Sequence, residues 1–378
     1  MALAAMPLAQ AAGAAPSSIV SESPPALATS VETSAGTWLT VPMGHLDQPL
    51  NTFWQLFFRA TDGSTWSNVT STLATATNGG LIVATPDGHS VEVGIRPANL
   101  LTFSTILTAS PTQTSWSTGL LPAGLAADNS ALATDPLSGD SVALLNDGGG
   151  VRVVSSVRSL STWRTLTSEA ALASSSAGRH CRLSTISAVG YDGTRAVVGG
   201  GCRRPGTVGI FARSGAGWRL VGPTLPPSLD QGEIDILSLR QAGEEISTLF
   251  SVTPAHGETS LVAAWAGAGG QWSISRSLPV SSSQRVLSIG PASGTGMFVV
   301  LSAPGGSEEA DVVGPDASWQ RLPTLPQGTS TVAIGPANTI DALAVSDTVF
   351  ADWLLSPGSS NWVKGQSANV PIEFGSSG

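Results

Sequence analysis

A tryptophan recurs along this chain at near-constant intervals, each time after small or turn-forming residues. The intervals are 50, 47, 55, 54, 47 and 43 residues, and the copies are Trp66, Trp116, Trp163, Trp218, Trp272, Trp319 and Trp362. Self-similarity at a period of about 40–50 residues is the signature of a repeat architecture. Seven copies at this spacing limit the chain to an array of similar units.

Each repeat contains several short runs with strand character. The unit before Trp218 and just after it reads RLSTISAVGY, TRAVVGGGC, TVGIFARS and WRLVGPTLP. Asp192-Gly193 separates the first two runs, and Asp-Gly is a hairpin signal because both turn residues take positive φ. Apolar residues alternate with other residues at Val91, Val93 and Ile95, as in half-buried strands. The pattern predicts an all-β fold, a seven-bladed β-propeller of four-stranded antiparallel blades.

The repeated tryptophan is predicted to open the outermost strand of its blade, where a large ring covers the edge and fills the wedge between neighbours. The Leu-Pro that follows in WRLVGPTLP and WQRLPTLP ends that strand, because proline cannot donate to the ladder. The alternative, that these rings line a ligand site, is disfavoured because they recur at the same place in every unit.

The first blade is short, with 28 residues between Trp38 and Trp66, and it lacks an innermost strand. We therefore expect the segment from Asn369 to Phe374 to supply that strand and close the ring in blade one.

The chain begins with an Ala-rich apolar run whose small residues suit a signal-peptide cleavage site, although no Lys or Arg precedes Arg59. We interpret residues 1–36 as a signal-peptide remnant with a disordered Ala/Ser/Pro-rich tail, the alternative being a disordered tail alone. Residues 37–378 then form a single propeller. An extracellular or cell-envelope location is expected, with Cys181 and Cys202 as a disulfide and no transmembrane segment after the signal region.

The amino-acid composition limits the classes of binding partner. The net charge is -9 and only 11% of residues are charged, so a nucleic-acid or anionic-membrane partner is disfavoured. We expect a monomer that uses no cofactor.

Several scarce polar residues are expected on one face of the ring, the top, where the loops between second and third strands and between blades lie. A Cys181–Cys202 bridge would fix four of them, Arg179, His180, Arg203 and Arg204, around one corner that attracts an acidic sugar. The alternative is that these arginines only neutralise nearby carboxylates. The full set of candidate ligand-binding residues is Arg179, His180, Arg203, Arg204, Arg96, His45, His256 and Glu258.

Catalytic and metal signatures are incomplete. His256 and Glu258 fit no metal motif, and no metal site is expected. Asp147, Asp230, Glu258 and Glu308 are carboxylates that a glycoside hydrolase on this scaffold would have to bring together across the ring.

The tryptophan-terminated units resemble the sialidase-type repeat propellers, whose Asp box reads S-x-D-x-G-x-x-W; DGSTW at Asp62 to Trp66 is a shortened copy. VVGGGC in the fourth unit has a kelch-like character. Over about residues 36 to 374 the chain resembles secreted propellers of actinobacteria. Sialidase chemistry, as the resemblance implies, needs a Tyr nucleophile, but Tyr191, the single tyrosine, is expected on the face opposite the site.

These observations favour a secreted binding or interaction module that recognises acidic glycans or a protein partner through its top face. The alternatives are a carbohydrate-active hydrolase or lyase on the same scaffold and a purely structural envelope component.

Overall fold

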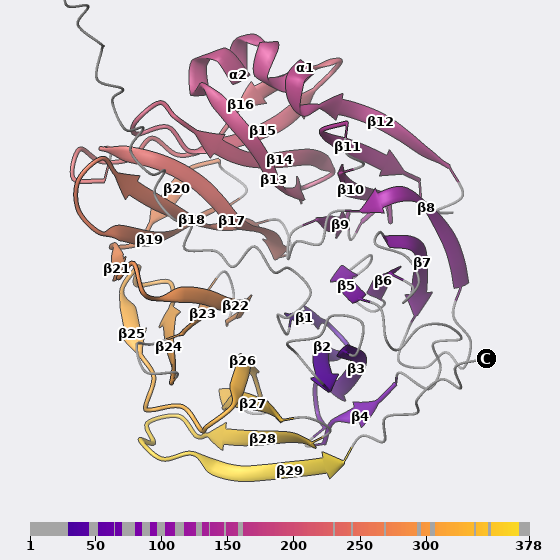
Figure 1. Cartoon of the computed structure of the whole chain (residues 1–378), viewed down its shortest axis with the longest axis vertical. Helices are drawn as coiled ribbons and strands as arrows, with labels where there is room; N and C mark the ends of the chain where they lie inside the picture. The colour runs from indigo at the N-terminus through magenta and orange to yellow at the C-terminus, as the bar shows by residue number, and fades with distance from the viewer. Residues whose placement is uncertain are drawn as a thin grey trace, which may run out of the picture.

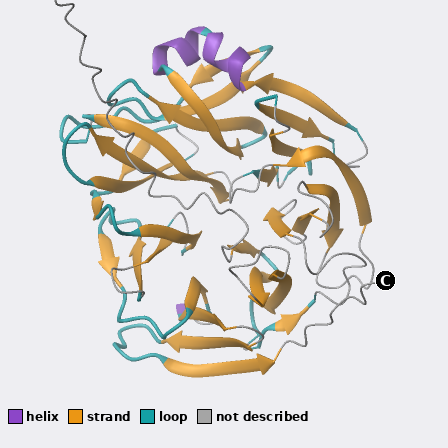
Figure 2. Cartoon of the chain, viewed as in Figure 1, coloured by secondary structure: helices purple, strands orange, loops and turns teal. Residues whose placement is uncertain are grey.

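The computed structural model describes residues 29–44, 52–63, 65–69, 80–84, 91–96, 103–109, 117–125, 131–135, 137–146, 149–157, 162–229, 231–242, 245–267, 270–292, 296–302, 307–335, 338–346 and 349–369. Over this part the chain is all-β apart from two short helices between β12 and β13 and a single 3₁₀ residue. Figure 2 places both helices at the outer edge of the molecule.

The strands follow one another in antiparallel groups of four. The first groups are β1 (Thr29–Thr33), β2 (Gly36–Gly44), β3 (Thr52–Ala60) and β4 (Ser67–Asn68); then β5 (Gly80–Ala84), β6 (Val91–Arg96), β7 (Phe103–Ala109) and β8 (Ser117–Leu125); then β9 (Leu132–Thr134), β10 (Ser141–Asn146), β11 (Val151–Ser156) and β12 (Trp163–Ser168). The helices α1 (Glu169–Ser174) and α2 (Ser176–Cys181) come next.

The remaining groups are β13 (Leu183–Asp192), β14 (Arg195–Cys202), β15 (Gly209–Ser214) and β16 (Gly217–Leu220); then β17 (Gly232–Ala242), β18 (Glu245–Pro254), β19 (Thr259–Ala266) and β20 (Trp272–Ile274); then β22 (Arg285–Pro291), β23 (Met297–Ser302), β24 (Glu308–Val313) and β25 (Trp319–Arg321); then β26 (Thr329–Ile334), β27 (Ile340–Ser346), β28 (Val349–Leu355) and β29 (Val363–Asn369). A short extra strand, β21 (Leu278–Val280), pairs with β19.

The groups are arranged around a common centre, with the first strand of each group nearest the centre (Figure 1). Some neighbours also share single backbone pairings: Leu145 of β10 pairs with Leu125 of β8, and Cys202 of β14 pairs with Ile234 of β17. This arrangement is that of a β-propeller.

The core lies between neighbouring sheets. Val142 and Leu144 of β10 are fully buried in one cluster with Val198 of β14 and Phe211 of β15, which belong to the next sheet. The same sheet buries its other face, through Ile210 and Val197, against Ile236 and Phe250 of the sheet that follows. Each sheet therefore completes its core only with its neighbours, which explains why the sequence repeats.

The predicted tryptophan at the start of the fourth strand is confirmed in three groups, whereas Trp66 and Trp362 come directly before β4 and β29. Trp163, Trp272 and Trp319 each begin the fourth strand of their group, and Trp218 is the second residue of β16.

The prediction of a C-terminal innermost strand in the first sheet is corrected. That position is taken by β1, which pairs with β2 through Val31 and Trp38 and lies against β22 and β26. The C-terminal β29 ends at Asn369 and pairs with β28, and residues 370–378 lie outside the described part. The run TSVET is short and follows an Ala/Ser/Pro-rich stretch, so the sequence alone assigned it to the tail; the sheet begins at Thr29, not at Thr37.

The first and last sheets meet through side chains. The rings of Phe57 and Phe350 are stacked with centroids 4.5 Å apart, and both are buried. The backbone N–H of Trp66 donates to Gln366 Oε1 at 2.6 Å, and Gln366 Nε2 donates to the Trp66 carbonyl at 2.9 Å. We call this contact between the two sheets the seam.

Candidate functional site

The predicted disulfide is present. Cys181, the last residue of α2, is bonded to Cys202, the last residue of β14, with their Cα atoms 5.1 Å apart. Both side chains are buried in the apolar cluster between two sheets, beside Leu172 and Ala177 of the helices. The bond therefore ties the helical connection to the sheet below it.

The two helices were not predicted from the sequence; this segment was expected to be a loop. Ser168 caps α1 by accepting from the N–H of Ala171, and Ser175 caps α2 by accepting from the N–H of Gly178 at 3.0 Å. Serine caps followed by alanines favour helix, so SEAALASSSAGRHC carried a readable signal. Helix α2 ends at Cys181 because Arg182 takes a left-handed conformation with φ 57°.

Five basic residues gather at this place, and we call them the basic corner: Arg179, His180, Arg182, Arg203 and Arg204. All five are exposed. The backbone holds the two halves together, since the N–H of Arg204 donates to the Cys181 carbonyl at 3.1 Å and that of Arg203 to the Arg182 carbonyl at 3.3 Å. The structure thus brings together the four residues that the sequence predicted and adds Arg182.

The side chains of the corner are only partly engaged. Arg204 Nη1 lies 3.1 Å from His180 Nδ1, and Arg179 Nη1 donates to the Ser174 carbonyl. Among the described residues no carboxylate lies within ion-pair distance of the four guanidinium groups. No ion pair among the described residues therefore supports the alternative that these arginines neutralise nearby carboxylates.

Two carboxylates stand next to the corner on the neighbouring sheet. Glu233 and Asp235 are exposed residues of β17, on either side of the buried Ile234 that pairs with Cys202. Although Asp235 is exposed, partial desolvation by the surrounding protein and then the like charge of Glu233 raise its pKa, while Arg203 acts in the opposite direction. Neither carboxylate was among the residues singled out in the sequence.

The other predicted site residues do not join this cluster in the described contacts. His256 and Glu258 are exposed in the turn between β18 and β19. Arg96 ends β6, and its side chain lies outside the described part of the structure, as does all of His45. Tyr191 is buried in β13 beside the Asp192-Gly193 turn.

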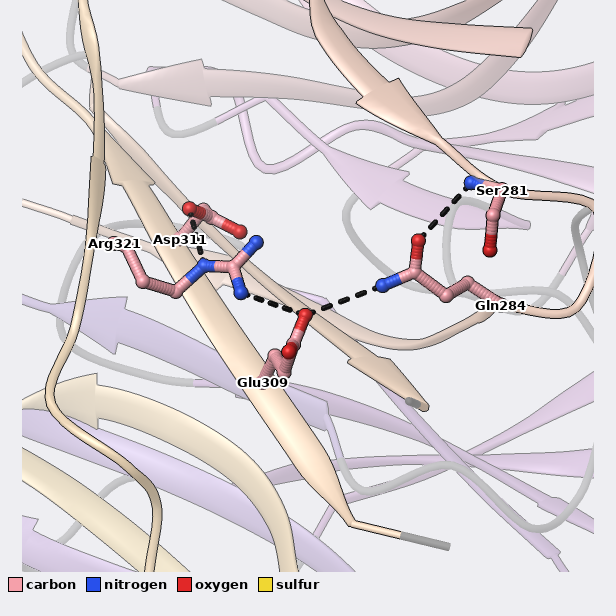
Figure 3. A network of polar contacts seen from close by, with 5 residues as sticks. All are labelled: Ser281, Gln284, Glu309, Asp311 and Arg321. Carbon is pink, nitrogen blue, oxygen red and sulfur yellow. Dashed lines mark hydrogen bonds and ion pairs between the residues drawn. The ribbon is translucent and has the colours of Figure 1, made fainter. Parts of the chain in front are cut away.

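The carboxylates considered for hydrolysis are not shown to converge. Asp147 and Asp230 lie outside the described residues. Burial raises the pKa of Glu308. Its neighbour Glu309 is held in a polar network, in which Arg321 Nη1 lies 2.6 Å and Gln284 Nε2 lies 3.2 Å from Glu309 Oε2 (Figure 3). Because Gln284 Oε1 also accepts from the N–H of Ser281 at 3.0 Å, this network fixes the loop before β22.

Neither a metal centre nor a membrane helix emerges from the described ranges. No three His, Cys, Asp or Glu side chains are grouped there so that they could hold a metal ion. No helix in the same ranges has the length and apolar character needed to cross a membrane.

No protein-family model matches this sequence, and no curated protein matches it either. Among solved structures it is similar to a GH74 xyloglucanase from Xanthomonas campestris, with a TM-score of 0.53, 15% identity, and coverage of 89% of this chain and 55% of that one. It is also similar to TolB from Acinetobacter baumannii (TM-score 0.47, 12% identity, 76% and 67% covered) and to the six-bladed β-propeller lectin of Aleuria aurantia (TM-score 0.41, 13% identity, 92% and 96% covered).

The chain spans about half the length of the xyloglucanase, and at such low identity this likeness concerns the fold alone. Together with the four-stranded antiparallel sheets around one centre, it defines the chain as a β-propeller protein. The sialidase-type, kelch-like and actinobacterial resemblances stay predictions.

Proposed function

We propose that this chain is an exported binding module, a single seven-bladed propeller that recognises acidic glycans through its basic corner. Seven groups of four strands among the described residues support the blade number. The disulfide and the Ala-rich start of the chain support export, because disulfides persist in oxidising compartments.

The observation that carries the proposal is the concentration of arginines around the basic corner of an acidic protein. Residues 151–220 contain ten arginines but only Glu169 and Asp192 as acids, although the whole chain has a net charge of -9. Like charges repel one another, so holding several arginines close together costs electrostatic free energy. A bound anion would offset that cost. Arginine suits this role because its planar fork binds carboxylate and sulfate groups in a bidentate manner.

A first prediction concerns Arg203→Ala/Arg204→Ala. We expect this variant to lose at least about tenfold in affinity for an oligogalacturonate, because each charge-assisted hydrogen bond contributes about 1.5–3 kcal/mol. Isothermal titration calorimetry with the chain from Thr29 onward measures the change. The matched control is Arg164→Ala/Arg219→Ala, which removes the same charge from two other exposed arginines, on β12 and β16.

An equal loss in the control would mean that overall charge, not the corner, attracts the ligand. If the unaltered chain binds no acidic glycan, the proposal fails and a protein partner becomes the better hypothesis.

A hydrolase on the same scaffold is the second candidate, since Asp235 has a raised pKa and a carboxylate neighbour, as a general acid requires. Release of shorter oligosaccharides on prolonged incubation, absent in Asp235→Asn, would favour it.

A further inference from the structure

The strand register places the corner and the carboxylates in one continuous surface. Cys202, the last residue of β14, pairs with Ile234 of β17 in antiparallel fashion, and continuing this register brings Arg203 near Glu233 and Gly201 near Asp235. Residues directly opposite in such a pair have Cα atoms about 4.5–5.5 Å apart. Ile234 is buried, so the side chains of Glu233 and Asp235 both project from the exposed face.

Gly201 permits the close approach of Asp235. A Cβ at this position would collide with Asp235 Oδ1 and with Ser184 Oγ. The Asp235 carboxylate therefore lies against Gly201, two residues before Arg203 in the chain. Because Ser184 Oγ donates to the Gly201 carbonyl at 3.1 Å, that hydroxyl is already engaged.

Arg203 favours the charged form of Asp235, but these carboxylates are not bonded to the corner. Among the described residues, no ion pair joins either of them to Arg203, and no donor lies within hydrogen-bond distance of them. A pure polyanion site would not retain two carboxylates at its edge, because they repel the ligand. Unpaired carboxylates are, however, strong acceptors for hydroxyl groups.

We propose that the ligand is a hexuronate unit with free vicinal hydroxyls, whose acid group binds Arg203 and its neighbours while Glu233 and Asp235 accept from the hydroxyls. This inference rests on the proposed function and deepens it. The ligand would be distinguished from sulfate or phosphate polymers by the hydroxyls, and from neutral sugars by the acid group. Partial desolvation already disfavours the charged form of Asp235, and hydroxyl donors would offset that cost.

The test uses two polyanionic probes, tetragalacturonate and inorganic tetraphosphate, which lacks sugar hydroxyls. We expect Asp235→Asn to bind tetragalacturonate about tenfold more weakly, since an amide is a weaker acceptor than a carboxylate. The same variant should bind tetraphosphate as well as or better than the unaltered chain, because one repelling charge is gone. Glu233→Gln should behave alike, and it serves as the second variant if Asp235→Asn misfolds.

The outcomes separate the two proposals. If both carboxylate variants bind tetragalacturonate more tightly, the carboxylates only repel and this inference is overturned, while the proposed function stands. If the unaltered chain binds neither probe, the proposed function itself is wrong. Equal binding of both probes by the unaltered chain would show that the basic corner recognises negative charge alone. That result would also overturn the inference.

Discussion

At the scale of single residues, the seam between the first and last sheets contains an arginine that is almost fully buried. Arg59 forms an ion pair with Asp341, donates to the Ile334 carbonyl at 2.7 Å and lies 4.3 Å from the ring centre of Trp66. Burial lowers the pKa of Arg59 to about 10, and Asp352 opposes that change. Arg59 thus links the first and last sheets, because it belongs to β3 while Ile334 and Asp341 belong to β26 and β27.

Asp352 is a second buried carboxylate at the seam. Its burial raises the pKa of the carboxyl group, although the Gln366 backbone and Arg59 act against this. A raised folded-state pKa means that its contribution to stability is present at acidic pH and is lost as the pH rises through that pKa. We expect Asp352→Asn to gain more in melting temperature, relative to the unaltered chain, at pH 7 than at pH 4.

Thermal melts at the two pH values provide the measurement, and Asp341→Asn is the comparison. Removing one partner of a buried pair costs about 3–5 kcal/mol, so Asp341→Asn should destabilise the protein at neutral pH. A larger loss for Asp352→Asn at pH 7 than at pH 4 would show instead that Arg59 requires both carboxylates.

At the scale of elements, the repeated tryptophans join consecutive sheets. Trp272 Nε1 donates to the Val221 carbonyl and Trp319 Nε1 to the Arg276 carbonyl, both at 2.8 Å, and Trp362 Nε1 lies 3.4 Å from the Pro323 carbonyl. Each acceptor lies just after the fourth strand of the preceding group, two of them within the Leu-Pro motif. The tryptophan of one sheet therefore contacts the backbone that follows the outermost strand of the preceding sheet.

Trp272→Phe removes the indole N–H and leaves the Val221 carbonyl without this donor, so we expect a loss of about 1 kcal/mol in the free energy of unfolding. Trp163→Phe is the matched control, because Trp163 Nε1 is buried without a hydrogen-bond partner among the described residues. Urea denaturation compares the two. Equal losses would mean that the rings act by packing alone.

At the scale of the whole molecule, the closure of the ring depends on where the N-terminal strand lies. β1 adds to the first sheet and contacts β22 and β26 of the last two groups, and Gly290 of β22 leaves room for Ser30 Oγ. The first and last sheets then meet through the side chains of the seam, not through a shared strand, within the described part of the chain.

A chain that begins at Ser34 lacks β1, and we expect it to melt at a clearly lower temperature and to aggregate, because the edge of β2 is then unpaired. The control is a chain that ends at Asn369, which keeps every described strand. Calorimetry and light scattering provide the comparison. Should the chain ending at Asn369 aggregate while the chain from Ser34 melts unchanged, the C-terminal segment closes the ring after all.

Much of the fold was predictable because its signals are local. The tryptophan period, the alternation of apolar residues and the Asp-Gly turns predicted an all-β propeller of four-stranded antiparallel sheets. The helices at the basic corner were missed although Ser168 and Ser175 marked their starts, because the repeat pattern left only a loop at that point. The exposed arginines of the corner were found through their neighbouring cysteines.

The sequence by itself determined the repeating strand pattern, the disulfide and the concentration of arginines, since each depends on residue type and spacing along the chain. Only the tertiary structure decided that β1, not the C-terminal segment, completes the first sheet, and that Glu233 and Asp235 adjoin Arg203. Both depend on which strands pair and in what register, and strands with similar apolar alternation are interchangeable until the sheets pack together.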